Sequence, residues 1–203
     1  MKNFKYIILF LITLGVVSCD KHEIEYMTTP IDKGMAEIQL HYFVPVTAVA
    51  ANNIYKVAIG NQEYINNGAA VISTYNAIPS GSVGRFYAIK DGDVNIKLYK
   101  GSDMELVYDK NVELNAGKQN VFIYDFDKEP IVFENGYPYN TNTTMETDST
   151  CWVKFYNFMY EKEGEYCTLK LQYQYQYTDS EGKKSDWNNL GEPIGFGEST
   201  GWQ

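Results

Sequence analysis

Histidine is scarce in this chain, with only His22 and His41 among 203 residues. So few histidines exclude a histidine-rich metal site and leave little for histidine-based acid–base catalysis. Basic residues are also in the minority: 17 Lys and Arg stand against 26 Asp and Glu, for a formal net charge of −9. An acidic chain repels phosphate backbones, so we expect no nucleic-acid partner. No set of residues forms a catalytic signature, and we expect a protein that is not an enzyme and holds no metal and no cofactor.

Helical patterns are missing as well. Beyond the N-terminal segment, no long stretch shows a 3.6-residue apolar period with caps. Hydrophobic residues still make up 44% of the chain, enough for a packed core, and 18 tyrosines help to raise the aromatic content to 15%. An aromatic-rich composition favours β-structure. The length of 203 residues gives room for one sizeable domain or two small ones.

Residues 1–18 are typical of a bacterial signal peptide. Lys2 and Lys5 precede an apolar run, IILFLITLGVV, over residues 7–17. The run is too short for a bilayer core of about 30 Å, which requires about 20 helical residues. It ends in VVSC, residues 16–19, which resembles the lipobox of bacterial lipoproteins. This resemblance implies that Cys19 carries the lipid and becomes the mature N-terminus.

A lipid on Cys19 makes the membrane a partner and predicts an outer-membrane protein of the cell envelope. Residues 20–23 (DKHE) partly resemble the acidic export tags of surface lipoproteins in gut Gram-negative anaerobes. Because the acidic residues are interrupted, an orientation toward the periplasm or toward the cell surface stays open. The polar, aperiodic residues 19–34 are expected to form a flexible tether.

From residue 35 to residue 133 the pattern favours short strands separated by turn signals. We expect strands over residues 37–42, 53–60, 70–75, 82–90, 93–100, 105–114 and 118–126. His41 falls on the polar face of the first strand, where we expect it to be solvated. Asp91-Gly92 is the strongest local hairpin signal, because a type I′ turn needs positive φ at both central residues. Short strands at this spacing predict an antiparallel, immunoglobulin-like β-sandwich.

Four segments of this region have characteristic patterns of strand and turn residues: AEIQLHYFVP (36–45), IYKVAIGNQEY (54–64), PSGSVGRFYAIKDGDVNIKLY (79–99) and VELNAGKQNVFIYDF (112–126). They resemble a family of immunoglobulin-like modules of secreted bacterial proteins, classed as a domain of unknown function. The resemblance covers residues 36–127. It implies a β-sandwich on a surface lipoprotein, a module that often occurs in tandem, and no known reaction.

Residues 134–149 (ENGYPYNTNTTMETDS) lack an apolar period and are expected to form a linker or a long loop. Residues 148–150 (DST) resemble the acceptor triplet for O-glycans in the same gut anaerobes, which makes Ser149 a candidate O-glycosylation site.

Residues 150–203 start the strand pattern again without completing it. The residue pattern of the first strand is repeated in CWVKFYNFMY (151–160). A second strand-like segment, TLKLQYQYQY (168–177), follows it. Too few residues remain for a whole sandwich, so we expect a second, partial β module. It is an incomplete module, a part of a longer chain, or a set of strands that augments the first sheet.

Cys151 and Cys167 lie in this second region. An exported chain permits a disulfide. A hairpin turning at residues 161–164 would place Cys167 opposite Phe158 and Cys151 opposite Gln174, so the two sulfurs would not meet. We favour two separate buried thiols.

Tyrosine and glutamine alternate from residue 172 to residue 177, and Trp187 follows. A strand with this pattern has one tyrosine face and one glutamine face. If these faces are exposed, the rings stack on sugars and the amides bond sugar hydroxyls; the candidate glycan contacts are then Tyr173, Tyr175, Tyr177 and Trp187. If the strand is half-buried, the tyrosines fill the core and the glutamines face water, which is the more general arrangement and the one we favour.

The sequence therefore predicts a non-catalytic, lipid-anchored envelope lipoprotein that mediates surface or envelope interaction, with its ligand unspecified. One alternative is a glycan-binding accessory lipoprotein of a polysaccharide-uptake system. Another is a fimbrial or pilus-type subunit whose partner is another envelope protein, joined through a donated strand. An aromatic row exposed on one face favours the first alternative, and a missing core strand favours the second.

Overall fold

The computed structural model describes residues 34–79, 85–136 and 152–203. The predicted signal peptide, Cys19, Ser149 and Cys151 lie outside these residues, as do most of the predicted tether and linker. The described residues form thirteen β-strands and one short 3-10 helix, η1 (Ala50–Asn52). No helix among them has the length and apolar character needed to span a membrane. The predicted all-β fold is confirmed.

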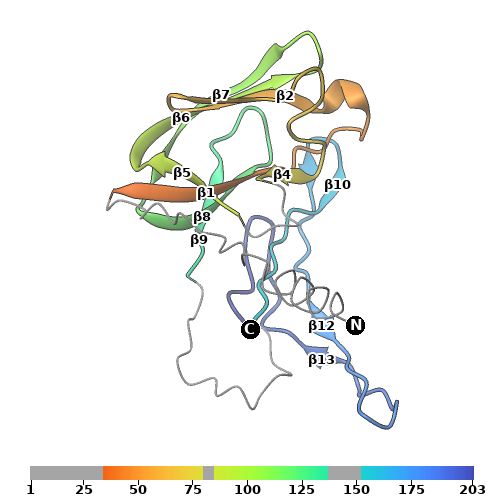
Figure 1. Ribbon diagram of the computed structural model, residues 1–203. Coiled ribbons are helices and arrows are strands. Elements are labelled where there is room, and N and C mark those ends of the chain that lie inside the picture. The colour runs from red at the N-terminus through yellow and green to blue at the C-terminus, as the bar shows by residue number, and fades with distance from the viewer. Residues whose placement is uncertain (1–33, 80–84, 137–151) are drawn as a thin grey trace, which may run out of the picture. The chain divides into compact units, whose positions relative to one another are not determined.

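Two sheets build the sandwich (Figure 1). Sheet A consists of five strands: β1 (Met35–Tyr42), β4 (Asn76–Ile78), β5 (Tyr87–Lys90), β8 (Gly117–Ile123) and β9 (Ile131–Glu134). Its order is β4-β1-β8-β9, and β5 pairs with the first half of β1 while β4 pairs with the second half. β1 and β8 run parallel, whereas all other pairs in the sheet are antiparallel. This pair is the one parallel exception among the strand pairs of the described residues, which are otherwise antiparallel as we predicted.

Sheet B is a four-stranded antiparallel sheet in the order β3-β2-β6-β7. Its strands are β2 (Ile54–Ile59), β3 (Gln62–Ile65), β6 (Gly92–Lys100) and β7 (Glu105–Leu114). The inward side chains of β6 are Val94, Ile96 and Leu98, which are buried with those of sheet A in one hydrophobic core. Burying an aliphatic side chain of this size stabilises the fold by about 1.5–3 kcal/mol. The apolar face of β6 therefore holds the two sheets together.

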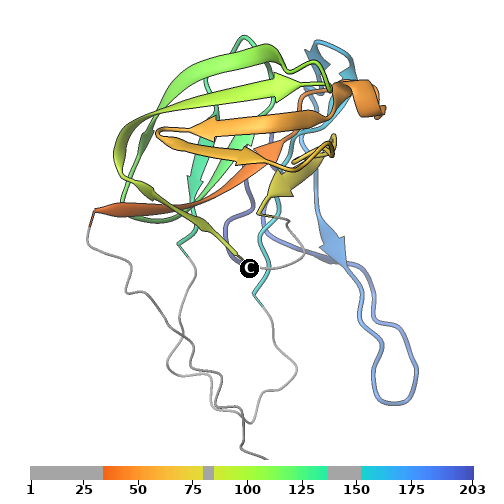
Figure 2. The same ribbon diagram turned by 45° about the horizontal axis from the view of Figure 1, so that its top comes forward.

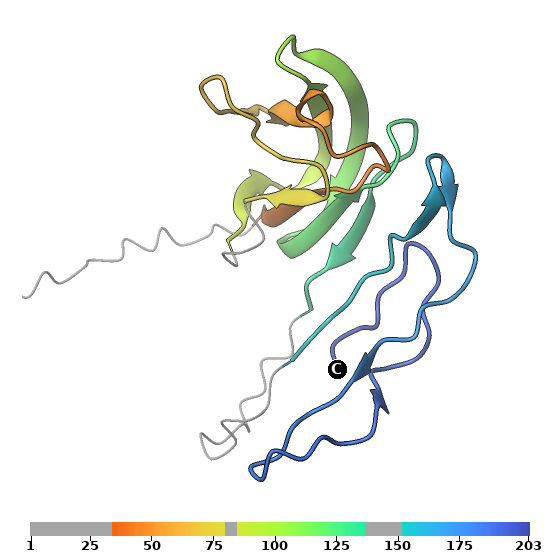
Figure 3. The same cartoon turned by 90° about the vertical axis from the view of Figure 1, so that its right-hand side faces the viewer.

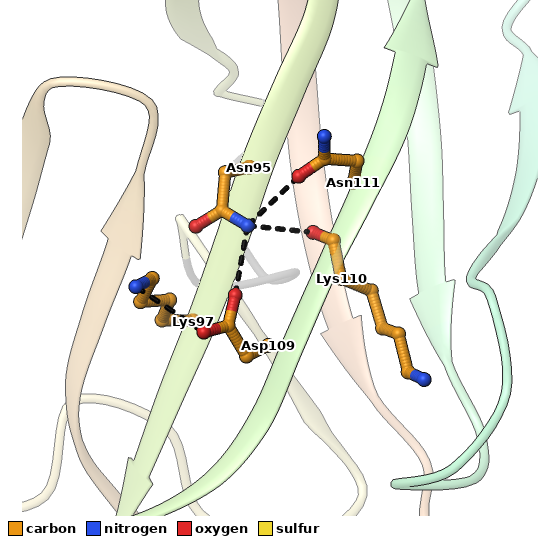
Figure 4. Close-up of polar contacts among 5 residues, drawn as sticks. All are labelled: Asn95, Lys97, Asp109, Lys110 and Asn111. Carbon is orange, nitrogen blue, oxygen red and sulfur yellow. Dashed lines mark hydrogen bonds and ion pairs between the residues drawn. The ribbon is translucent and has the colours of Figure 1, made fainter.

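The outward side chains of β6 and β7 bond to each other instead (Figure 4). Asn95 Nδ2 donates to Asp109 Oδ1 at 2.8 Å and to Asn111 Oδ1 at 2.9 Å. Lys97 Nζ lies 3.2 Å from Asp109 Oδ2, and these bonds hold the pKa of the Asp109 carboxyl below its ordinary value. Cross-strand pairs of this kind satisfy polar groups at the surface. The outer face of sheet B thus needs no covering layer.

The predicted hairpin at Asp91-Gly92 is wrong. β5, before this turn, pairs with β1 in sheet A, and β6, after it, pairs with β2 and β7 in sheet B. The two residues therefore carry the chain from one sheet to the other, with Gly92 at a φ of +98°. A local turn signal shows where the chain bends but not which strand each side will join, and the long-range pairing with β1 decides that here.

Residues 70–75 do not form the strand that we predicted there. This stretch makes only an isolated bridge between Ile72 and Ile54, and the strand β4 begins after it, at Asn76. Tyr75 takes a positive φ of 59°, which ends any extended run before β4. The apolar stretch therefore fills the core through Ile72 without extending a sheet.

The outer face of sheet A is covered by residues from the C-terminal part of the chain (Figure 3). Phe122 of β8 stacks on Phe158 with ring centroids 4.6 Å apart and lies 4.8 Å from Tyr156. Phe133 of β9 lies 4.7 Å from Tyr156, and Phe196 closes the group at 5.7 Å from Phe158. We call these five residues the aromatic interface. Aromatic pairs at such separations stabilise beyond their buried area.

The strands of residues 152–203 are much shorter than the sequence predicted. β10 (Tyr160–Lys162) pairs with β11 (Glu165–Tyr166), and β12 (Gln174–Tyr175) pairs with β13 (Asn188–Asn189). The chain turns between Lys162 and Glu165, which pair with each other, within the stretch that we considered for a hairpin turn. Isolated bridges and loop hydrogen bonds connect the rest of this region.

Cys167 has a free, buried thiol in this region. Its backbone N–H donates to Met159 O at 2.9 Å, so it lies opposite Met159 and not opposite Phe158 as the predicted register required. Its Sγ has only a weak contact, 3.9 Å from Leu169 O. The thiol is thus a small buried group in the packing of the β10–β11 hairpin.

His41 is half-buried, although its polar strand face led us to expect a solvated side chain. Its ring stacks on Phe122 at 4.1 Å, and its Nε2 lies 3.1 Å from Asn120 Oδ1. Asn120 Nδ2 reaches the Tyr156 hydroxyl at 3.4 Å, which connects the histidine to the covering residues. Burial lowers the pKa of His41 to about 4, although the bond to Asn120 acts in the opposite direction. His41 therefore packs as a neutral ring beside the aromatic interface.

This burial predicts an acid-sensitive fold. An unfolded histidine takes up a proton near its ordinary pKa of 6.5, whereas folded His41 resists protonation down to about 4. The free energy of unfolding should accordingly be unaffected by His41 above pH 6.5 and fall by about 3 kcal/mol between there and pH 4. Denaturant unfolding at several pH values would measure this loss. In His41→Gln the difference between neutral and acidic pH should shrink by that amount, and an identical pH profile would contradict the prediction.

Candidate functional site

The hairpin that carries β12 and β13 extends away from the two sheets (Figure 2). Leu171 and Ile194 exchange backbone hydrogen bonds of 2.8 and 2.9 Å at its base. Leu190 N donates to Tyr173 O at 2.8 Å further along, so the two strands stay paired over most of their length. We call residues 171–194 the arm. A two-stranded hairpin alone is marginal in water, so the arm needs further support.

The turn of the arm is built by Asp179. Its Oδ1 accepts the backbone N–H groups of Glu181 and Lys183, both at 2.9 Å. Gly182 takes a φ of +81° and donates its N–H to Asp179 O at 3.0 Å. An aspartate with a glycine three residues later is suited to such a turn. The carboxylate accepts hydrogen bonds from free backbone amides, and glycine adopts the left-handed conformation without strain.

The alternating glutamines hold the two strands of the arm together. Gln172 Nε2 donates to Gly191 O at 3.1 Å, and Gln176 Nε2 donates to Ser185 O at 2.9 Å. Between them, Gln174 Nε2 donates to Asn189 Oδ1 at 2.8 Å. Sequence reasoning assigned these amides to water or to sugar hydroxyls. The structure uses them as cross-strand bonds instead, which a sequence shows only once the pairing register is known.

The tyrosines of the arm do not fill a sandwich core, contrary to the arrangement that we favoured. Tyr177 is 59% exposed and Tyr175 is 47% exposed. Trp187 is 64% exposed, although tryptophan is normally well buried. The arm thus presents three large aromatic side chains to solvent. This is the exposed arrangement that the glycan hypothesis required.

Tyr173 differs from the other two tyrosines because it anchors the base of the arm. Its ring stacks on Phe155 at 4.6 Å, and its hydroxyl donates to Tyr156 O at 2.9 Å. Burial raises the pKa of this hydroxyl above its ordinary value. Tyr156 belongs to the aromatic interface, so Tyr173 connects the arm to the cover of sheet A. Of the four predicted contact residues, Tyr173 is the one with a structural role.

The exposed aromatic residues of the arm lie on both of its strands. Tyr175 pairs with Asn188. Further along, Thr178 bridges to Lys184, so the register shifts by one residue on the strand that carries Trp187. Side chains alternate along an extended strand, which assigns Tyr175 and Tyr177 to one face, whereas Trp187 lies at the register shift on the facing strand.

Exposed apolar side chains are concentrated in the same part of the chain. Residues 152–187 contain eight large apolar side chains that are exposed: Trp152, Phe155, Met159, Tyr166, Leu169, Tyr175, Tyr177 and Trp187. Exposed aromatic groups that gather in one region mark contact surfaces more often than singly scattered ones do. Candidate sites of other kinds have less support, because no group of three or more His, Cys, Asp or Glu within the described ranges could hold a metal ion.

The chain was compared with known proteins by sequence and by structure. No protein-family model matches it, and neither the curated proteins nor the solved structures gave a match. The candidate site therefore depends on the geometry of the arm.

Proposed function

We propose that this chain is a non-catalytic, lipid-anchored protein of the cell envelope that contacts surface components through its arm. The observation that carries this proposal is the exposure of Tyr175, Tyr177 and Trp187 on a hairpin whose two strands are joined by the glutamine bonds. Ordered aromatic side chains give large contact area at low entropic cost. Such a hairpin is suited to binding.

The proposed location follows from the N-terminal residues. The signal-peptide pattern of residues 1–18 and the lipobox-like residues 16–19 favour export and lipid attachment at Cys19. The outer membrane of a Gram-negative envelope is the proposed site, with the sandwich as a tethered module of the immunoglobulin-like kind. On such a module the arm would present its aromatic side chains away from the sheets.

A glycan is the second candidate ligand, and the arm also favours it. Tyr175 and Tyr177 lie on one face, about 6.6 Å apart along the strand, which allows both rings to stack against one chain of sugars. The glutamine amides contribute less than the sequence suggested, because they are already bonded within the arm. Stacking would therefore dominate over hydrogen bonding in sugar recognition.

The arm can be tested with a triple variant, Tyr175→Ala/Tyr177→Ala/Trp187→Ala, in protein that starts at Asp20. Co-sedimentation with purified Gram-negative outer membranes and a panel of immobilised polysaccharides would measure binding. We expect the variant to bind at least about tenfold more weakly, since each stacked ring contributes roughly 1 kcal/mol. A polysaccharide signal would identify the glycan function, and a signal from membranes alone would favour a protein or lipid component.

The matched control is Ile65→Ala/Leu106→Ala, which removes two exposed apolar side chains from sheet B. It should bind as the wild-type protein does. Equal binding by the wild-type protein and the arm variant would refute the proposed role of the arm.

A further inference from the structure

A cleft of about 370 Å³ lies at one end of the sandwich, apart from the arm. Its walls come from the loop after β1, the end of β6, the loop after β8 and the turn of the β10–β11 hairpin. The lining side chains that carry its chemistry are Lys100, Tyr124, Asp125, Asp127, Tyr160 and Glu163. A volume above about 300 Å³ is sufficient for a small ligand or a long side chain.

The walls of this cleft are held in place by contacts between the sandwich and the hairpin. The Tyr160 hydroxyl donates to Tyr124 O, and the Tyr160 ring lies 5.1 Å from Phe196 of the aromatic interface. In the loop after β8, Asp125 Oδ1 accepts the N–H of Asp127 at 2.8 Å. The hairpin turn and this loop thus face each other across a preformed opening, which lowers the entropic cost of binding.

The cleft has an excess of negative charge. Asp125, Asp127 and Glu163 line it together with a single cation, Lys100. Lys100 Nζ lies 3.4 Å from Glu105 Oε2, and Glu105 does not line the cleft. The ammonium charge of Lys100 is therefore already paired with a carboxylate outside the cleft. Within the described part of the chain, Asp127 and Glu163 make no side-chain hydrogen bond or ion pair.

Burial and the negative charge of the cleft together raise the pKa of its two tyrosine hydroxyls. Burial raises the pKa of Tyr160, and the nearby Asp125 carboxylate raises it further. The pKa of Tyr124 is raised by the same two causes in the same order. Unpaired carboxylates together with tyrosine side chains form a complementary environment for an organic cation. The carboxylates supply charge, and the rings supply cation–π contact and cover for an aliphatic stem.

We propose that this cleft binds a lysine or arginine side chain of a basic polypeptide segment. Lys and Arg have both a cationic group and an alkyl stem, and the cleft offers carboxylates beside Val44, Pro45 and Val46. An anionic ligand would meet two unpaired carboxylates, and a neutral sugar would leave their charge uncompensated. The formal net charge of −9 would also attract a basic partner at long range.

Binding can be measured with three blocked tripeptides that differ only at the centre: acetyl-Gly-Lys-Gly-amide, its Arg analogue and its Gln analogue. Each is titrated into the full-length chain in detergent, and two-dimensional amide spectra report which residues respond. We expect the Lys and Arg peptides to shift cleft residues such as Asp127 and Glu163. The affinity should fall when salt is raised from about 0.05 M to about 0.5 M, because salt screens exposed charges.

The test variants are Asp127→Asn and Glu163→Gln, which remove charge without changing shape. Each should weaken binding about threefold and the double variant about tenfold, as expected for exposed ion pairs. Glu161→Gln is the matched control, because Glu161 lies on the same hairpin but does not line the cleft. Unchanged amide spectra outside the substituted sites would confirm that each variant is folded.

Four outcomes would overturn the proposal. Equal binding of the Gln peptide would show that charge has no role. Equal loss of affinity in Glu161→Gln would show an effect of overall charge and no defined cleft. Glucosamine is a second source of an ammonium group, and if it alone shifted the amide signals of the cleft residues, the ligand would be an amino sugar and not a polypeptide. If no probe shifted these signals, the cleft would not be a binding site for cations.

Discussion

Phe122→Ala is expected to lower the free energy of unfolding by about 3–5 kcal/mol, the usual cost of truncating a buried phenylalanine. Phe122 is only 3% exposed although it points away from the core between the sheets. Its ring contacts His41, Phe158 and Tyr156 within 5 Å, so it joins sheet A to the residues that cover it. Its loss would leave a cavity at the centre of the aromatic interface. Chemical denaturation followed by tyrosine and tryptophan fluorescence would measure the change.

Phe155→Ala is the matched control, because Phe155 has the same side chain, 40% exposed, and stacks on Tyr173 outside the aromatic interface. We expect it to cost about 1 kcal/mol or less. Comparable losses in both variants would mean that Phe122 contributes no more than a surface ring. The cover of sheet A would then not stabilise the fold.

Cys19→Ala is expected to move the protein from the membrane fraction to the soluble fraction. Under the proposed anchoring, the acyl chains on Cys19 hold the chain at the membrane, and each buried methylene contributes about 0.8 kcal/mol. Two or three such chains bind firmly, and the substitution removes all of them at once. Fractionation of the expressing cells followed by immunoblotting would measure the distribution of the protein.

Cys167→Ala provides the control for this substitution. Cys167 is a free, buried thiol of the folded region, so its loss should leave the protein with the membranes. The lipobox interpretation would be wrong if Cys19→Ala still sedimented with membranes and resisted extraction with concentrated salt. Residual attachment of that kind would point to the folded part of the chain.

The sequence by itself determined most of the sandwich strands. Alternation predicted β1, β2, β6 and β7 to within two residues at each end. These strands could be predicted from the sequence because the two-residue period of a strand is a local property of the chain. The turn of the β10–β11 hairpin was equally local, with Gly164 at a positive φ.

The candidate site was predicted only in part. Sequence reasoning named Tyr175, Tyr177 and Trp187 as candidate contacts but favoured an arrangement with the tyrosines buried, whereas all three side chains are exposed. It left open whether they were buried, because alternation assigns residues to faces without showing what covers each face. The anchoring role of Tyr173 required the contact with Phe155, 18 residues earlier, which no local pattern contains.

Only the tertiary structure decided which faces are covered. His41 lies on a strand face that looks solvated in sequence, yet Phe122 and the C-terminal residues cover it. The consecutive apolar residues 121–123 were an available signal, since a strand that is buried on both sides loses its alternation. The chain also crosses between sheets at Asp91-Gly92 where local turn chemistry predicted a hairpin. Both outcomes depend on long-range contacts, whose free energy outweighs the local preferences that a sequence pattern records.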